Sequence, residues 1–327
     1  MMRLLKKLAS LRLTLAGFVV LFAAVIVDQQ FGPPALYTIV PPLGLLACNL
    51  GAALLVDSRI RRTPALYAFH VCLLLLLLIA AAGQLLSFEA RLSLVEGQAY
   101  QPDMLRDARG GIVAPPPLLA GRLQQASIKV KYAADLTRGK THSRMIVPGQ
   151  GEVEFGDDVP LVTDGYRIYT TSNKGFAVLL TWLPDTGGAQ LGAVQFPSFP
   201  IKELGQQAAW TPPLGSPLIL RLDLPPSRYA DSWTLDADFA RTAALQVVVD
   251  GEIEHLEPGD ATTLADGGRL TFEGIRMWMG YDVTYDPTLP WMFSVATLCV
   301  ICMAVHFVGR LRRPASQRSR SPQRCPA

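Results

Sequence analysis

The residues most able to carry chemistry are two histidines inside long apolar stretches, His70 in 65–88 and His306 in 289–309. An ionisable side chain in a membrane-length apolar segment is costly, so each is a functional-site candidate. At 1.5 Å per helical residue, His70 would lie ~9–12 Å beyond Arg62 and Pro64, and His306 ~6 Å before Arg310. Neutral imidazole is a strong axial ligand of haem iron, so both are candidate haem ligands. The alternative is a hydrogen bond between helices.

Cysteine adds a second pattern, because Cys299, Cys302 and His306 fall at i, i+3 and i+7 and would share one helix face. That face could bind a metal or carry redox chemistry, but membrane cysteines more often pack as small apolar residues. Cys48 and Cys72 also lie in apolar stretches. The segment 89–288 has no cysteine, so it cannot contain a disulfide.

The other two histidines, His142 and His255, lie in polar surroundings and are predicted to be exposed loop residues. The chain has no phosphate-binding loop, no nucleophile elbow, no zinc-protease motif and no dinucleotide fingerprint. We therefore predict no catalytic residues and no metal site apart from a haem iron.

Four apolar stretches set the architecture. The chain is half hydrophobic with a mean hydropathy of +0.26, which suits a protein that is part membrane and part water-soluble. The predicted spans are 11–28, 36–56, 65–88 and 289–309, and Pro41 and Pro42 interrupt the second. The first could also be a cleavable signal peptide, although Asp28, Gln29 and Gln30 follow it instead of a small-residue cleavage site.

The distribution of basic residues predicts the orientation of the spans in the membrane, because loops rich in lysine and arginine stay on the cytoplasmic side. The N-terminal tail, the loop 57–64 and the tail 310–327 hold 13 of the 30 basic residues, and the loop 28–35 has none. Both termini are therefore predicted to be cytoplasmic. The segment 89–287 lies outside, and its 17 basic and 25 acidic residues give a net charge of −8. The tail 310–327 is predicted to be disordered.

The segment 89–288 is predicted to be an all-β, sandwich-like domain, because short β-prone runs alternate with Gly, Pro and Asp. The runs are 127–133, 166–171, 176–183, 218–224, 245–249, 269–275 and 281–285. Asp250-Gly251 has the signature of a two-residue hairpin, and Asp164-Gly165 and Asp266-Gly267-Gly268 also mark turns.

Several of these segments, taken in order, resemble a known family. They are LASLRLTL (8–15) at the first span, a short basic loop before His70, LSLVEGQ (92–98) after the third span, and YDVTYDPTLPW (281–291) before the last. Together they resemble the ResB/CcsB family of system II cytochrome c biogenesis proteins. The resemblance covers all four spans and is weak through the β-rich segment.

The resemblance implies a membrane subunit that handles haem b without being catalytic itself. It implies a ResC/CcsA-like membrane partner, export of haem for attachment to apocytochrome c outside, and a place in the bacterial inner membrane with a periplasmic domain. His70 stands where the family has an axial haem ligand, and His306 is a further candidate. A non-haem scaffold whose acidic β domain docks a partner is the main alternative, and a receptor with an external β domain is another.

Overall fold

The computed structural model describes residues 2–32, 35–118, 123–200, 205–213, 215–224, 232–241, 243–249, 252–264 and 267–311. The chain divides into a helical unit, formed by 1–88, 109–115 and 286–327, and a sheet unit, formed by 89–108 and 116–285. Of the sequence predictions, Asp250-Gly251, Asp266 and the tail beyond Leu311 lie outside the described residues.

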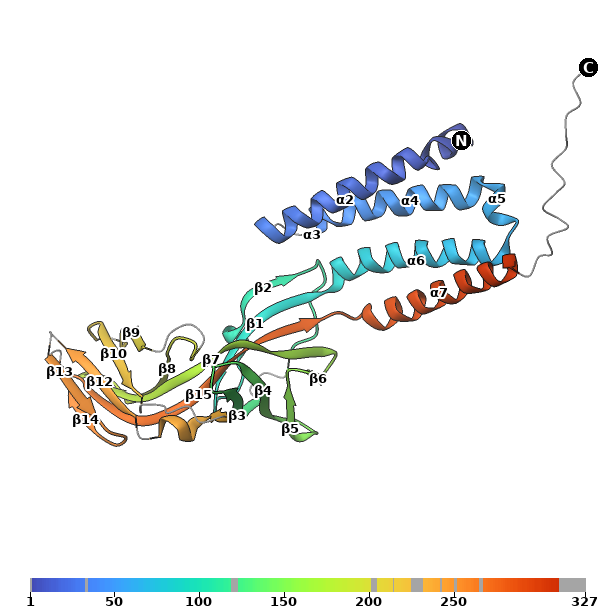
Figure 1. Cartoon of the computed structure of the whole chain (residues 1–327). Helices are drawn as coiled ribbons and strands as arrows, with labels where there is room; N and C mark the ends of the chain where they lie inside the picture. The colour runs from blue at the N-terminus through green and yellow to red at the C-terminus, as the bar shows by residue number, and fades with distance from the viewer. Residues whose placement is uncertain are drawn as a thin grey trace, which may run out of the picture. The chain divides into compact units, whose positions relative to one another are not determined.

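The helical unit contains three described helices that are long and apolar enough to cross a membrane: α2 (Leu11–Phe31), α6 (Pro64–Leu86) and α7 (Leu289–Leu311). Short helices accompany them, namely α1 (Met2–Leu8), α3 (Ala35–Thr38) and α5 (Ser58–Arg61). α2 packs on α4 (Val40–Val56), α4 on α6, and α6 on α7, so these four lie side by side in a layer (Figure 1).

In the helical unit, the structure differs from the sequence prediction at the predicted span 36–56. Instead of one long helix there are two, the 4-residue α3 and the 17-residue α4, separated at Ile39. Pro41 and Pro42 lie at the start of α4, where their missing N–H groups cost least. At 1.5 Å per residue α4 reaches about 25 Å, less than the ~30 Å hydrocarbon core. By itself α4 is therefore only a short apolar helix.

A buried asparagine ties α4 to the first helices. Thr14 Oγ1 donates to Asn49 Oδ1 at 2.7 Å, and Asn49 Nδ2 donates to the carbonyl oxygens of Leu8 and Ser10. A hydrogen-bonding side chain is worth most between helices where water is absent, so these bonds fix α2 against α4.

The sheet unit is rich in β-strands, as predicted, and its described strand pairs are antiparallel. The strands are β1 (Phe88–Val95), β2 (Arg106–Gly110), β3 (Gln124–Ala133), β4 (Arg138–Val147), β5 (Gly151–Gly156), β6 (Leu161–Thr163), β7 (Tyr166–Leu183), β8 (Gln190–Gln195), β9 (Gln206–Trp210), β10 (Leu218–Asp223), β11 (Ser232–Leu235), β12 (Ala244–Val249), β13 (Glu252–Leu256), β14 (Ala261–Thr263) and β15 (Arg269–Tyr285). Two short 3₁₀ helices, η1 (Pro102–Met104) and η2 (Ala237–Ala240), are also present.

The described strands form three sheets. The largest has the order β2-β1-β15-β7-β6, with β14 and β8 added beside β15 and β7, and the others are β13-β12-β10-β9 and β11-β3-β4-β5. The long strands β7 and β15 pair from Tyr166↔Tyr285 to Leu183↔Arg269 and form the axis of the largest sheet (Figure 1).

The turn chemistry and the alternation agree with the sequence where they are described. Asp164 and Gly165 both have positive φ, 50° and 81°, and connect β6 to β7 as a type I′-like turn. In β3, Ile128, Val130 and Tyr132 are buried, whereas Lys129 and Lys131 are exposed. β12 pairs with β13 through Val249↔Glu252, the hairpin predicted around 250–251.

Two segments quoted in the sequence analysis, 92–98 and 281–291, contribute side chains that connect strands of this unit by hydrogen bonds. The Glu96 carboxylate accepts from the backbone N–H groups of Ile128 (2.7 Å) and Met277 (3.2 Å), which joins the end of β1 to β3 and β15. The Tyr281 hydroxyl donates to Gln125 Oε1 at 2.6 Å and lies 2.7 Å from Ser143 Oγ. Gln125, Ser143 and Tyr281 are almost fully buried, so the network is satisfied away from water.

Removing the Tyr281 hydroxyl is expected to destabilise the sheet unit. Tyr281→Phe leaves the buried Gln125 Oε1 without its donor, at a cost of about 1.5 kcal/mol. Thermal unfolding in detergent should show a midpoint lower by roughly 3–6 °C. Tyr169→Phe, at an exposed position on β7, is the matched control and should change nothing. An unchanged midpoint for Tyr281→Phe would contradict the described network.

Candidate functional site

His70 lies on α6, half-buried, one helical turn after Leu66. Its Nδ1 is 2.7 Å from the carbonyl oxygen of Leu66. A carbonyl oxygen can only accept a hydrogen bond, so Nδ1 carries the proton and Nε2 keeps its lone pair. A histidine whose Nδ1–H is held by a backbone carbonyl is oriented for metal ligation through Nε2. The local structure therefore fixes the orientation of the His70 ring and leaves Nε2 without this hydrogen bond.

His306 lies on α7 and lines a cavity of about 540 Å³ between the beginning of α6 and the end of α7. Thr63, Pro64, Ala65 and Leu66 form one side, and Val305, His306, Gly309 and Arg310 form the other. Leu66, whose carbonyl orients His70, also lines this cavity. The two predicted histidines thus lie at the same end of the α6–α7 pair, although 236 positions separate them in sequence.

The cysteines of α6 and α7 lie in the packing between the two helices. Cys72 and Cys299 are buried and Cys302 is half-buried. The Cys299 thiol is 3.9 Å from the carbonyl oxygen of Phe69 and donates a weak hydrogen bond to it. Within the described ranges no three His, Cys, Asp or Glu side chains converge in a way that could hold a metal ion. The thiols therefore have the surroundings of small packing residues.

The residues at this end of α6 and α7 suit a haem group. A cavity of about 540 Å³ falls within the ~300–1,000 Å³ of small-molecule sites. Ala65, Leu66 and Val305 give it apolar walls, and Arg310 supplies a cation that could pair with an acidic substituent. His70 is one helical turn from Leu66 and is oriented by its carbonyl. The donor set of one imidazole plus one further candidate, His306, is the type that binds haem iron.

His142 and His255 lie on strands, not in the predicted loops, because the polar segments around them form hairpin partners. His142, on β4, has Nδ1 2.7 Å from Glu154 Oε1, and Arg144 Nε donates to Glu154 Oε2. These two bonds lower the pKa of the Glu154 carboxyl below its ordinary value. His255 is exposed on β13, as expected for a surface residue. In the described part of the chain, neither belongs to a group of three or more His, Cys, Asp or Glu side chains that could hold a metal ion.

Sequence reasoning missed two features of the sheet unit. The first is Lys174 on β7, which is fully buried, lies over the Tyr132 ring at 5.7 Å and donates to the Ser172 carbonyl at 3.4 Å. Burial lowers the pKa of its ammonium from 10.5 to about 8. A single lysine in a β-prone run gives no sequence signal for this.

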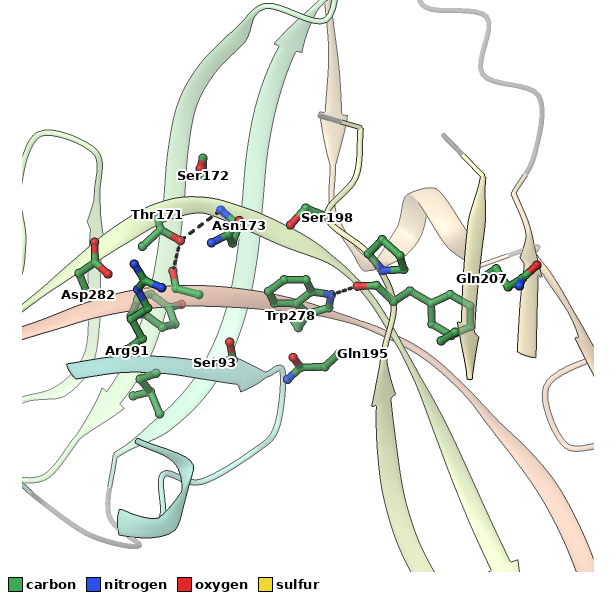
Figure 2. A pocket seen from close by; sticks show the side chains of 16 residues that line it. Arg91, Ser93, Thr171, Ser172, Asn173, Gln195, Ser198, Gln207, Trp278 and Asp282 are labelled. Atoms are coloured by element: carbon green, nitrogen blue, oxygen red, sulfur yellow. Dashed lines mark hydrogen bonds between the residues drawn. The ribbon is translucent and has the colours of Figure 1, made fainter. Parts of the chain in front are cut away.

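The second feature is a cleft of about 800 Å³, which Figure 2 shows. Its walls come from β1, from the middle of β7 and β15, from the segment 195–198 and from β9. Thr171 Oγ1 donates to the Gly280 carbonyl and accepts from the Asn173 N–H, which holds the two long strands together at the cleft. In the sequence, the segments 172–175 and 276–280 separate the predicted strands 166–171 from 176–183 and 269–275 from 281–285.

A scan against protein-family models and a search of the curated proteins found no match to this chain.

Proposed function

We propose that this chain is a ResB/CcsB-like membrane subunit that binds haem with His70 and passes it outward for attachment to apocytochrome c. The observation that carries the proposal is the hydrogen bond between His70 Nδ1 and the carbonyl of Leu66, which lines the α6–α7 cavity; this bond leaves Nε2 available as a ligand. His306, on the wall of that cavity, is the second candidate ligand. A bound haem supplies the iron that these nitrogens coordinate, and the chain supplies the oriented imidazole and an apolar surround.

The proposal includes an orientation in the inner membrane. α2, α3 with α4, α6 and α7 would make four crossings, with both termini cytoplasmic and the sheet unit periplasmic. The charge distribution supports this, because Arg59, Arg61 and Arg62 after α4 must share the cytoplasmic side with the basic N-terminal tail. A reporter enzyme that is active only in the periplasm should be active when fused after Ser87 and inactive when fused after Ala327. The opposite pattern would exclude this orientation.

The position of the cavity is consistent with the proposed transport route. His70 and His306 would lie in the cytoplasmic half of the membrane, because both are near the ends of α6 and α7 that carry Arg62 and Arg310. Haem made in the cytoplasm would meet these residues first. A ResC/CcsA-like partner would receive it, and the haem attachment chemistry would take place on that partner.

The test is the absorption spectrum of the protein, purified in mild detergent alone and with a co-expressed ResC/CcsA-like partner. We expect the reduced sample to show the spectrum of a b-type haem. A stable complex that contains no haem in either preparation would refute haem binding and favour the non-haem scaffold, in which the acidic domain only docks a partner.

A further inference from the structure

The cleft in the sheet unit is lined by several uncharged hydrogen-bonding side chains, together with the charged Arg91 and Asp282. The hydroxyl or amide groups of its walls belong to Ser93, Ser172, Asn173, Gln195 and Ser198. None of these side chains makes a hydrogen bond to another residue that the structure describes. Ser198 is buried as a residue, whereas Ser93 and Asn173 are half-buried and Ser172 and Gln195 are exposed. These side chains can therefore donate hydrogen bonds to a ligand in the cleft and accept them from it.

The floor of the cleft is apolar and fixed in place. Trp278 is 8% exposed and packs with Val95 and Ala177, and its Nε1 donates to the Phe196 carbonyl at 3.0 Å. Figure 2 shows the indole on β15 between Asn173 and Gln195. The cleft therefore offers a rigid apolar surface surrounded by donors and acceptors. That combination suits a ligand with regularly repeated amide groups and small side chains.

An edge strand borders the same cleft. Gln207 and Ala208 of β9 line it, and β9 pairs only with β10 among the described strands, so one edge of β9 has no strand partner there. A second depression of about 700 Å³ shares Pro197 and Gln207 with the first and extends over β9 and β10 to Gln246 of β12. Extended peptides can add as a further strand to an unpaired strand edge.

We propose that this cleft binds an extended, basic polypeptide segment, which pairs its main chain with β9 and with the uncharged side chains of the cleft. The basic character follows from the net charge of −8 over 89–287, which attracts a positive chain to the sheet unit. The inference concerns a different site from the haem site and does not require haem.

The probe is a short fluorescent peptide of alternating threonine and valine with a lysine at each end. We expect the full-length protein in detergent to bind it, and to bind a copy with alternate N-methylated amides at least tenfold more weakly, because methylation removes the main-chain donors. Ser93→Arg and Asn173→Arg should each weaken binding at least tenfold, since they place bulk and positive charge in the cleft. Ser232→Arg, at an exposed position on β11, is the matched control.

The proposal is overturned if the wild-type protein does not bind the peptide, or if the N-methylated copy binds equally well. It is also overturned if both arginine variants, folded by their thermal unfolding midpoints, retain wild-type affinity. Should only one variant fold, that variant decides. Displacement of the peptide by an oligosaccharide such as chitotriose would assign the cleft to carbohydrate instead. Because haem is absent from the assay, failure here leaves the haem proposal intact, and the reverse also holds.

Discussion

Replacing His70 with alanine is expected to lower the haem content of the purified protein at least tenfold. The coordinate bond from Nε2 is the strongest contact that this part of the chain can make to haem, and no other described histidine has its Nδ1 hydrogen-bonded to a backbone carbonyl. The readout is the ratio of haem absorbance to protein after size-exclusion chromatography. We expect a smaller loss for His306→Ala, since His306 lines the cavity but no carbonyl orients its ring.

Two controls separate ligation from folding in that experiment. His142→Ala removes a histidine of the sheet unit that hydrogen-bonds Glu154, and it should leave haem content unchanged. Thermal unfolding midpoints should be similar for all variants, because His70 makes no other described side-chain hydrogen bond. Equal haem content in wild type and His70→Ala, with equal stability, would remove His70 from the site.

Replacing the buried Lys174 with methionine is expected to stabilise the protein by about 2–3 kcal/mol at pH 7. Burial lowers the pKa of the ammonium from 10.5 to about 8, and a shift of that size corresponds to roughly 3 kcal/mol. Methionine has a similar length and carries no charge, although it forfeits the contact with the Tyr132 ring, worth about 0.5–1 kcal/mol. The unfolding midpoint should rise by roughly 4–12 °C.

The effect has a defined dependence on pH. Between about 8 and 10.5 the folded protein has lost the proton of Lys174 while the unfolded chain still binds it, so stability rises with pH across this window. Below pH 8 the full cost of the buried charge is present. The charged groups that act on it are Arg138, which lowers the pKa further, and Asp157, which raises it.

The measurement is the unfolding midpoint of wild type and Lys174→Met at pH 7 and pH 10. The difference between the two proteins should be large at pH 7 and small at pH 10. Lys131→Met, at an exposed position on β3, should match the wild type at both values. A Lys174→Met protein that is less stable than wild type at pH 7 would show that the buried ammonium has stabilising partners, contrary to its described surroundings.

Much of the architecture follows from simple sequence patterns. Long uncharged stretches predict α2, α6 and α7 because an apolar helix that long has few other environments. The alternation in β3 and the Asp164-Gly165 turn are equally local, since both depend on one strand face or on two dihedral angles. Pairing of β12 with β13 was predictable for the same reason.

The rest depends on contacts between distant residues. β7 and β15 each look like two strands in sequence, because Gly175 and Gly280 interrupt the apolar runs. Only the pairing of these strands with each other makes each continuous, with irregularities at Phe272/Gly274 and Met279/Tyr281. Residues of the two interrupted segments, Ser172, Asn173, Trp278 and Gly280, line the cleft in the sheet unit.

For the histidine site as well, one part could be predicted from the sequence and another part depends on contacts between distant residues. Composition and spacing predicted that His70 and His306 lie near one surface of the membrane, but no pattern could predict that Leu66 orients the first and lines the cavity of the second. That relation depends on α6 and α7 packing against each other. The sequence also gave no sign of the burial of Lys174, which results from the approach of β3 to β7.

Rescue of a His70→Gly variant by free imidazole tests the central claim most directly. Glycine leaves room for an exogenous imidazole to take the place of the missing side chain as iron ligand. We predict that the reduced His70→Gly protein lacks the b-type haem spectrum, and that adding imidazole and haem restores it, with no effect of imidazole on wild type. A His70→Gly protein that retains the wild-type spectrum, or a folded one that imidazole cannot restore, would contradict ligation by His70.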